Sequence, residues 1–304
     1  MIWMLVAALV FLAPTEALAW GPITHLAHGA EVLRNLTILG VGLQRLLQQH
    51  RLPYLYGCVG ADITQAKKYT RAQQAHCHSW TIGWTILEHA KSDAQRAFAY
   101  GYLTHLSSDV YSHNHYVPTQ LIVSYQALAL RHISWEARFD ALQDSTIREI
   151  IGELRQHRFP ECDALVRDVV SRTLFSFGTD KRIFNSFIAI HDLDQWHRVM
   201  RRLIAASRFS LPADIVDRYN DACGGSIVDM LKRGKRADNQ SADPTGLDAL
   251  TLAKAVRDTL RTLDRRGRIS KRLHGEIEAL NQRKELGTLN LLPALQVAAG
   301  PRLA

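Results

Sequence analysis

Two histidine–carboxylate pairs in the sequence have the spacing of metal ligands on a helix. His105 and Asp109 are four residues apart in an apolar, helix-like stretch, and His132 and Glu136 repeat this spacing downstream. On an α-helix, residues i and i+4 lie on one face, one turn apart. An imidazole and a carboxylate so placed can bind one divalent metal ion, zinc above all. One such pair alone is more often part of a core helix with hydrogen-bonded histidines, but two pairs in one chain predict a metal site.

Further candidate ligands lie upstream of both pairs. Asp62 follows two closely spaced glycines, which predict a turn that presents its carboxylate, although aspartate beside glycine is also a common turn former. His76 and His78 flank Cys77, so that either imidazole, or the thiol between them, is a candidate metal ligand. The choice between the two histidines stays open at this point.

The composition is that of a globular protein with a basic surface. Of 304 residues, 47% are hydrophobic and 22% charged, which is enough to bury a full core. The 14 histidines are unusual, and many fall in the first half of the chain. A formal charge of +8 favours an anionic partner such as a phospholipid surface, a nucleic acid or a phosphorylated substrate. A basic exported protein without such a partner is the alternative.

The N-terminal residues 1–19 read as a signal peptide. Residues 2–12 form an apolar run that is too short to span a bilayer, and Ala17 and Ala19 supply the small-x-small pattern before Trp20. We therefore expect cleavage to expose Trp20 and the protein to be exported, either to the periplasm or out of the cell. No later run is long enough for a transmembrane segment. The four cysteines match no finger-like zinc motif, and their pairing cannot be read from the sequence.

Helical periodicity dominates the chain, and strand signals are nearly absent, which predicts an all-α fold. Helices over 94–112 and 124–151 are expected to carry the two histidine–carboxylate pairs. After the signal peptide we expect a helical domain over 20–230, a polar linker over 231–247 and a basic helical segment over 248–304. From residue 231 onward the sequence contains 15 Lys and Arg but only 8 Asp and Glu. This tail is either a solvated helical hairpin or a surface for an anionic lipid or polymer.

The candidate ligands occur in a distinctive order along the chain. They are Trp20, His25, Asp62, His76 or His78, His105, Asp109, His115, His132 and Glu136. This order and spacing resembles the zinc-dependent phospholipase C family, whose superfamily also holds the fungal zinc single-strand nucleases. The resemblance covers residues 20–136 and is strongest from His105 to Glu136.

The resemblance implies an all-α multi-helix bundle that binds three zinc ions, here with an extra C-terminal helical segment. It implies that the amino group and carbonyl of Trp20 bind metal after cleavage. It assigns to Asp62 the orientation or deprotonation of a zinc-activated water. The five-residue step from Trp20 to His25 resembles the nuclease branch, whereas Glu136 resembles the phospholipase branch. We find no counterpart of the calcium-binding β-domain of the phospholipases.

The ligand that follows Asp109 is open between two histidines. Helical geometry favours His113, which is a further i, i+4 step, whereas the spacing of the family favours His115 and requires the helix to bend or end before Pro118. The family spacing is preferred here. Of the earlier pair, His78 is preferred over His76 because it precedes Ser79 and Trp80 in a context loosely like that of the family.

Three functions are compatible with these residues. The first is a zinc-dependent phosphodiesterase that hydrolyses phospholipids. The second is a single-strand nuclease of the same superfamily. The basic tail and the Trp20–His25 spacing support this alternative. The third is a non-catalytic protein in which zinc stabilises the bundle and the tail is a binding module.

Overall fold

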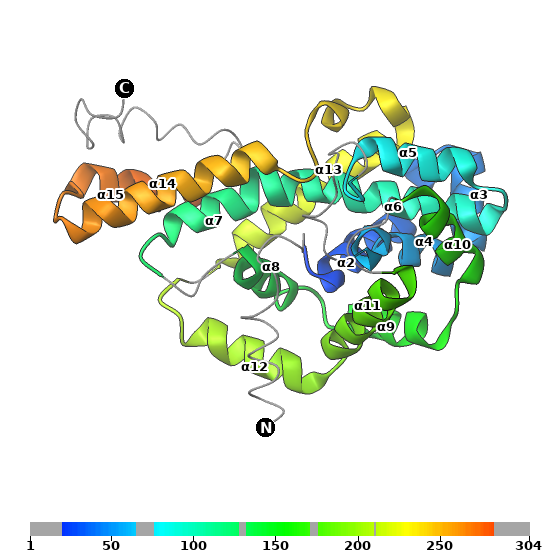
Figure 1. Ribbon diagram of the computed structural model, residues 1–304, viewed down its shortest axis with the longest axis horizontal. Helices are drawn as coiled ribbons and strands as arrows, with labels where there is room; N and C mark the ends of the chain where they lie inside the picture. Colours follow the sequence, from blue (N-terminus) through cyan, green and yellow to red (C-terminus); the bar gives the residue numbers. More distant parts are fainter. Residues whose placement is uncertain (1–19, 65–75, 128–131, 171–175, 210, 283–304) are drawn as a thin grey trace.

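The computed structural model describes residues 20–64, 76–127, 132–170, 176–209 and 211–282, and Figure 1 shows its arrangement. Over these ranges the chain is helical and contains no β-strand, which confirms the predicted all-α fold class. None of the described helices is both long and apolar enough to cross a membrane. The expected signal peptide over 1–19 lies outside the described residues, as does the end of the basic segment from residue 283.

Fourteen labelled α-helices and several short helical turns make up the described chain. The α-helices are α2 (Pro22–Arg34), α3 (Val41–Gln49), α4 (Arg51–Gly57), α5 (Trp80–His89), α6 (Asp93–Tyr111), α7 (Val117–Val123), α8 (His132–Asp140), α9 (Ile147–Gln156), α10 (Pro160–Val169), α11 (Phe177–His191), α12 (Asp194–Ala205), α13 (Ala213–Arg233), α14 (Leu247–Arg265) and α15 (Lys271–Glu278). The short turns are η1 (Leu36–Ile38), η2 (Gly60–Ile63), η5 (Ser112–Tyr116), η6 (Gly234–Arg236), η7 (Asp238–Ser241) and η8 (Ala279–Gln282).

Helix α6 is the centre of the bundle, with α2, α4, α5 and α13 packed around it. Its start is capped by Ser92, whose hydroxyl accepts a hydrogen bond from the backbone N–H of Gln95. Its second half is buried almost completely, including the polar residues Thr104, His105 and Asp109. Gly101 lets α4 approach closely, because a Cβ there would lie 2.0 Å from the Tyr54 carbonyl oxygen. The carboxylate and imidazole of α6 therefore face other helices and not solvent.

The sequence suggested that the helix carrying His105 and Asp109 ends before Pro118. In the structure the helical backbone continues through this proline. Helix α6 passes into a π-helical turn, η5, and then into α7, whose first turn tolerates Pro118 because its missing N–H has no partner to lose. A π-turn closes hydrogen bonds from residue i to i+5 and occurs mostly as a single turn inside α-helices. Within the segment 112–116, His113 is buried and His115 is partly exposed.

The expected continuous helix over 124–151 is wrong. Helix α8 ends at Asp140 and α9 begins only at Ile147. Between them the carboxylate of Asp144 accepts a hydrogen bond of 2.9 Å from the backbone N–H of Thr146. Such a local side-chain acceptor offers the backbone an alternative to the helical ladder.

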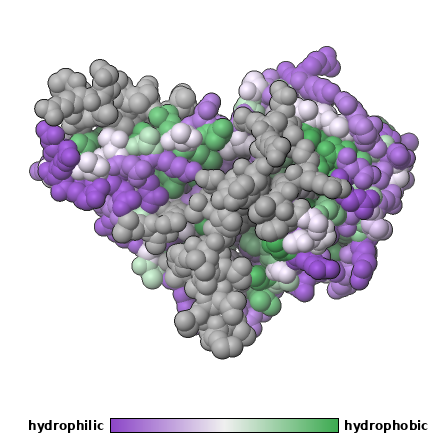
Figure 2. Space-filling model, viewed as in Figure 1, coloured by the Kyte–Doolittle hydropathy of each residue, from purple (hydrophilic) through white to green (hydrophobic). Residues whose placement is uncertain are grey.

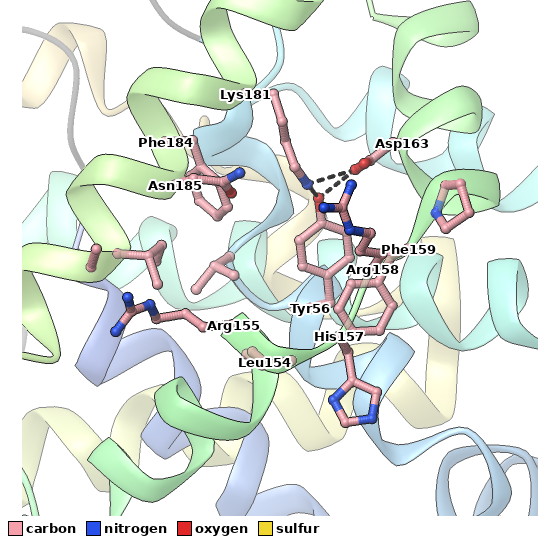
Figure 3. Close-up of a pocket in the computed structure, with 14 residues that line it drawn as sticks. Tyr56, Leu154, Arg155, His157, Arg158, Phe159, Asp163, Lys181, Phe184 and Asn185 are labelled. Carbon is pink, nitrogen blue, oxygen red and sulfur yellow. Dashed lines mark hydrogen bonds and ion pairs between the residues drawn. The ribbon is translucent and has the colours of Figure 1, made fainter.

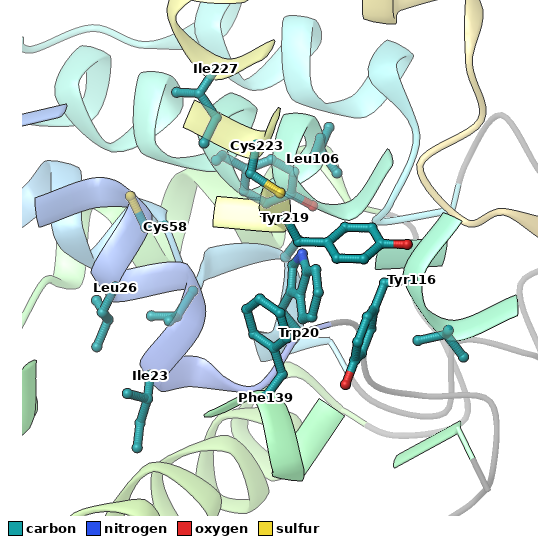
Figure 4. Close-up of a cluster of buried hydrophobic side chains, with 14 of the residues drawn as sticks. Trp20, Ile23, Leu26, Cys58, Leu106, Tyr116, Phe139, Tyr219, Cys223 and Ile227 are labelled. Carbon is teal, nitrogen blue, oxygen red and sulfur yellow. The ribbon is translucent and has the colours of Figure 1, made fainter. Parts of the chain in front are cut away.

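The side chain of Trp20 is fully buried in an aromatic cluster (Figure 4). Its ring centroid lies 4.0 Å from that of Phe139 and 4.8 Å from that of Tyr116. Its indole N–H donates to the backbone carbonyl of Ser108 at 3.1 Å. The indole therefore fixes the start of the described chain against α6, one residue before Asp109.

The N-terminus of α2 has no side-chain cap of its own, and Asp140 of α8 supplies one. Gly21 at the N-cap position has no side-chain acceptor. The Asp140 carboxylate accepts from the backbone N–H groups of Ile23 at 3.2 Å and Thr24 at 2.8 Å, and from the Thr24 hydroxyl at 2.6 Å. This contact joins residues about 117 positions apart and orients the helix that carries His25.

We expect Asp140→Ala to lower the free energy of unfolding by about 1–2 kcal/mol, because helix N–H groups lose their acceptor. Urea denaturation followed by circular dichroism measures this loss. Asp168→Ala, at an exposed carboxylate, is the matched control and should change little. An Asp140→Ala protein as stable as the wild type would show that this cap does not support α2.

The stretch 231–247, expected as a linker, packs on the bundle. The indole N–H of Trp80 donates to the Ala242 carbonyl at 2.9 Å, and that of Trp84 to the Gln240 side chain at 2.8 Å. Beyond it, α14 and α15 lie beside α7 on one side of the molecule. The outer end of this pair is mainly hydrophilic in Figure 2.

Candidate metal centre

The carboxylate of Asp109 on α6 is the meeting point of three imidazoles. Its Oδ1 lies 3.3 Å from His25 Nε2, and its Oδ2 lies 3.1 Å from His105 Nε2 and 3.3 Å from His78 Nε2. The predicted pair His105 and Asp109 therefore lies on one face of α6, as its spacing indicated. His25 joins it from α2, with its ring stacked on that of His105 at 3.7 Å between centroids.

Asp62 and His78 extend this cluster. Asp62 lies in the short turn η2 with only 4% of its surface exposed, and its Oδ1 is 3.4 Å from His78 Nε2. His78 Nε2 is in turn 3.1 Å from His105 Nε2. Two groups of potential ligands result, one of His25, His105 and Asp109 and one of Asp62, His78 and His105.

A backbone carbonyl determines which nitrogen of His105 faces the cluster. The carbonyl oxygen of Cys58, at the end of α4, lies 2.9 Å from His105 Nδ1 and can only accept, so Nδ1 carries the proton. In the neutral ring, Nε2 then presents its lone pair to Asp109 and His78. Such an outer hydrogen bond is the usual way to orient a metal-binding histidine.

The first cluster fits zinc by its donor types and its spacing. Ligand atoms about 2.0 Å from a tetrahedral zinc ion are about 3.3 Å apart, close to the distances found here. Both ring nitrogens of His25 and both carboxylate oxygens of Asp109 are buried and make no hydrogen bond of good geometry with described residues. Burial, together with the neighbouring His105, lowers the pKa of His25 and holds it in the neutral form that binds metal. A cation bound at this point would be held by lone pairs from both imidazoles and the carboxylate.

A second cluster forms where the π-turn η5 meets α8. His132 Nε2 lies 2.6 Å from Glu136 Oε1, and His113 Nε2 lies 3.7 Å from the same oxygen. All three residues are buried and could hold one further ion. His113 Nδ1 donates to the Pro244 carbonyl at 2.6 Å, which leaves its Nε2 facing Glu136.

The structure places His113, and not the preferred His115, beside the pair His132 and Glu136, so His113 is the residue we propose as the ligand here. The helix does not end after Asp109 but continues into the π-turn, and His113 keeps its direction toward α8. The ring of His115 lies instead beside Tyr111 on the partly exposed side, at 5.4 Å between centroids.

The other histidines near the site have different roles. His28 is held by Ser108 at 2.8 Å and Asn220 at 3.1 Å, which makes it a hydrogen-bonded core histidine. His76 is partly exposed and its Nδ1 accepts from the backbone N–H of His78 at 3.0 Å. With Cys77 and His78 it forms one more group that could hold a metal. His78 lies 3.4 Å from Asp62 and 3.3 Å from Asp109. The four cysteines are buried and form no disulfide.

Sequence reasoning missed two backbone groups of the site, the carbonyls of Cys58 and Pro244. Carbonyls carry no residue-type signal, and Pro244 lies in the stretch expected as a linker. The residue that points to close packing of this stretch is Gly246, whose φ is +56°. A Cβ there would lie 2.5 Å from the Cβ and the carbonyl oxygen of His113. The stretch 231–247 therefore packs directly against the segment that carries His113.

We expect Gly246→Ala to cost about 1–3 kcal/mol of stability and to lower the zinc content, because strain and a clash both act on His113. Gly267 is a matched control, since its φ is +64° but its Cβ would meet nothing within 4 Å. Gly267→Ala should lose stability through backbone strain alone and keep its metal. Unfolding curves and zinc contents are measured for both variants. Equal zinc contents would contradict the prediction that the contact between Gly246 and His113 supports metal binding.

One comparison with known proteins gives a match. The family model described as zinc dependent phospholipase C matches residues 24–208, which is more than half of the chain. No curated protein and no solved structure matches the chain. The matched range includes every candidate ligand except Trp20 and excludes α13 to α15.

Proposed function

The chain belongs to the zinc-dependent phospholipase C family, and from this premise we propose that it is a zinc-dependent phosphodiesterase that hydrolyses phospholipids. Its products would be a diacylglycerol and a phosphorylated head group. We further propose that it binds about three zinc ions and acts after export, with Trp20 as its first residue. Membership of the family supports the hydrolase class, and the substrate is the part that needs a test.

The observation that carries this proposal is the pair of buried imidazole–carboxylate clusters. In each cluster a backbone carbonyl fixes one histidine, His105 or His113, with Nε2 turned to a carboxylate. A purely structural zinc site needs four protein ligands and no acceptor beside it. Here more donor groups converge than one closed site uses, and Asp62 lies at the edge of the first cluster.

The residues of the chain then have separate tasks. Bound zinc would polarise the phosphate diester and make water a better nucleophile at neutral pH. Asp62 would accept the proton of the attacking water, because its carboxylate lies within the cluster and on a short turn. His25, His78, His105 and Asp109 would hold the first centre, and His113, His132 and Glu136 the second.

A basic end on α14 and α15 supports a phospholipid surface as the place of action. The turn that joins the two helices exposes five cationic side chains against one exposed carboxylate, that of Asp264. These residues are Arg265, Arg266, Arg268, Lys271 and Arg272. Juxtamembrane basic residues contribute about 1 kcal/mol each near an anionic leaflet. The same charge would also attract nucleic acid, so charge alone does not select the substrate.

A substrate comparison tests the proposal. The zinc-loaded protein is incubated with phosphatidylcholine vesicles or with single-stranded DNA, each with and without a chelator. We expect release of phosphorylated head group that stops with the chelator, and intact DNA. Chelator-sensitive DNA cleavage with intact lipid would instead assign the nuclease activity, and no turnover of either would favour a non-catalytic zinc protein.

A further inference from the structure

A cavity of about 540 Å³ lies between α4, α9, α10 and α11, apart from the metal ligands (Figure 3). Cavities of roughly 300–1,000 Å³ are typical of small-molecule sites. None of the candidate zinc ligands lines this one. Its walls come from four helices that the family resemblance assigned no role.

One side of the cavity is apolar and suited to a hydrocarbon body. Val59, Phe184 and Ile188 are buried core residues that line it. Tyr56 and Phe159 add two stacked rings, with 4.4 Å between centroids and 13° between planes. A hydrocarbon chain or ring of a ligand placed here would leave water and contact aliphatic and aromatic side chains.

The polar side carries an excess of positive charge. Lys181 Nζ lies 2.7 Å from Asp163 Oδ1 and also contacts the Tyr56 hydroxyl, as Figure 3 shows. The Tyr56 hydroxyl donates to the same carboxylate at 2.5 Å. Arg155 is paired with Asp192, whereas Arg158 is exposed and makes no ion pair with any described residue. Among the residues that line the cavity, the Asp163 carboxylate therefore pairs with Lys181, and the guanidinium of Arg158 is left for an added anion.

We propose that this cavity binds a small anionic amphiphile, with its oxyanion between Lys181 and Arg158 and its apolar body against Val59, Phe184 and Ile188. A carboxylate and a phosphate monoester share the chemistry that would be recognised: one compact oxyanion accepting from an ammonium and a guanidinium. Burial lowers the pKa of Lys181 to about 8, so an anion beside it would stabilise its charged form. The proposal does not depend on the substrate of the metal centre.

Calorimetric titration of the zinc-loaded protein tests this inference. The probes are decanoate and decyl phosphate below their micellar concentrations, with decan-1-ol and inorganic phosphate as partial ligands. We expect the two amphiphilic anions to bind and each partial ligand to bind at least tenfold more weakly. Tighter binding of one of the two anions identifies the head group. Equal binding of decan-1-ol would remove the role of the charge and overturn the proposal.

Variants locate the site. Lys181→Met and Arg158→Gln should each weaken decanoate or decyl phosphate binding about tenfold, because each removes one charged donor. Arg158 is exposed, so its replacement leaves the fold intact even if Lys181→Met does not. Arg182→Gln, next to Lys181 but outside the cavity lining, is the matched control. Binding that is lost with a chelator but unchanged in both cavity variants would place the anion at the metal centre and contradict the proposal.

Discussion

Asp62→Asn is expected to reduce the rate of phospholipid hydrolysis by roughly 10²–10⁴-fold, the usual range for a positioned acid–base group. The substitution keeps the size of the side chain and one oxygen but removes its charge and its basicity. Because His25, His105 and Asp109 remain in place, most of the zinc and the fold should persist. Hydrolysis rate, zinc content and helicity are measured on one preparation of the variant.

Asp258→Asn, at an exposed carboxylate of α14, is the control and should retain the wild-type rate. Unchanged turnover in Asp62→Asn would exclude Asp62 from the mechanism. Loss of all zinc together with the fold would make its role structural. Only a slow, folded and zinc-bearing variant agrees with Asp62 as the base.

Replacement of His113 and of His115 should have opposite outcomes. His113→Ala is expected to lower the zinc content by about one ion and to abolish turnover, because it removes an imidazole that faces Glu136 and His132. His115→Ala should keep both the zinc and most of the activity, since this ring lies beside Tyr111. Zinc analysis and hydrolysis assays of the two proteins decide between them. The reverse pattern would return His115 to the ligand set and show that the π-turn is not maintained in the metal-bound protein.

The sequence predicted the helical class and most of the residues that meet at the centre. Helical periodicity is a local property, and an i, i+4 pair such as His105 and Asp109 lies on one face wherever its helix lies. The ordered resemblance added His25 and connected both His25 and Asp62 to the pair on α6, which no local pattern could do. These residues converge because α2 and the turn η2 pack on α6.

The errors came from features that sequence patterns do not record. Helical geometry favoured His113 and the family spacing favoured His115; the π-turn after Tyr111 keeps the helix going, and His113 lies beside His132 and Glu136. The break between α8 and α9 contains a hydrogen bond from the Thr146 N–H to the Asp144 carboxylate. The carbonyl of Pro244 orients His113 from a stretch whose composition is typical of a linker. Each is a matter of backbone conformation, where residue type is a weak guide.

The most direct test is the zinc content of the purified protein after export. If the two clusters are metal centres, elemental analysis should find about three zinc ions per chain, and a chelator that removes them should abolish phospholipid hydrolysis. Zinc added back should restore both. A folded protein that carries no zinc, or that hydrolyses phospholipid equally well without it, would contradict the account.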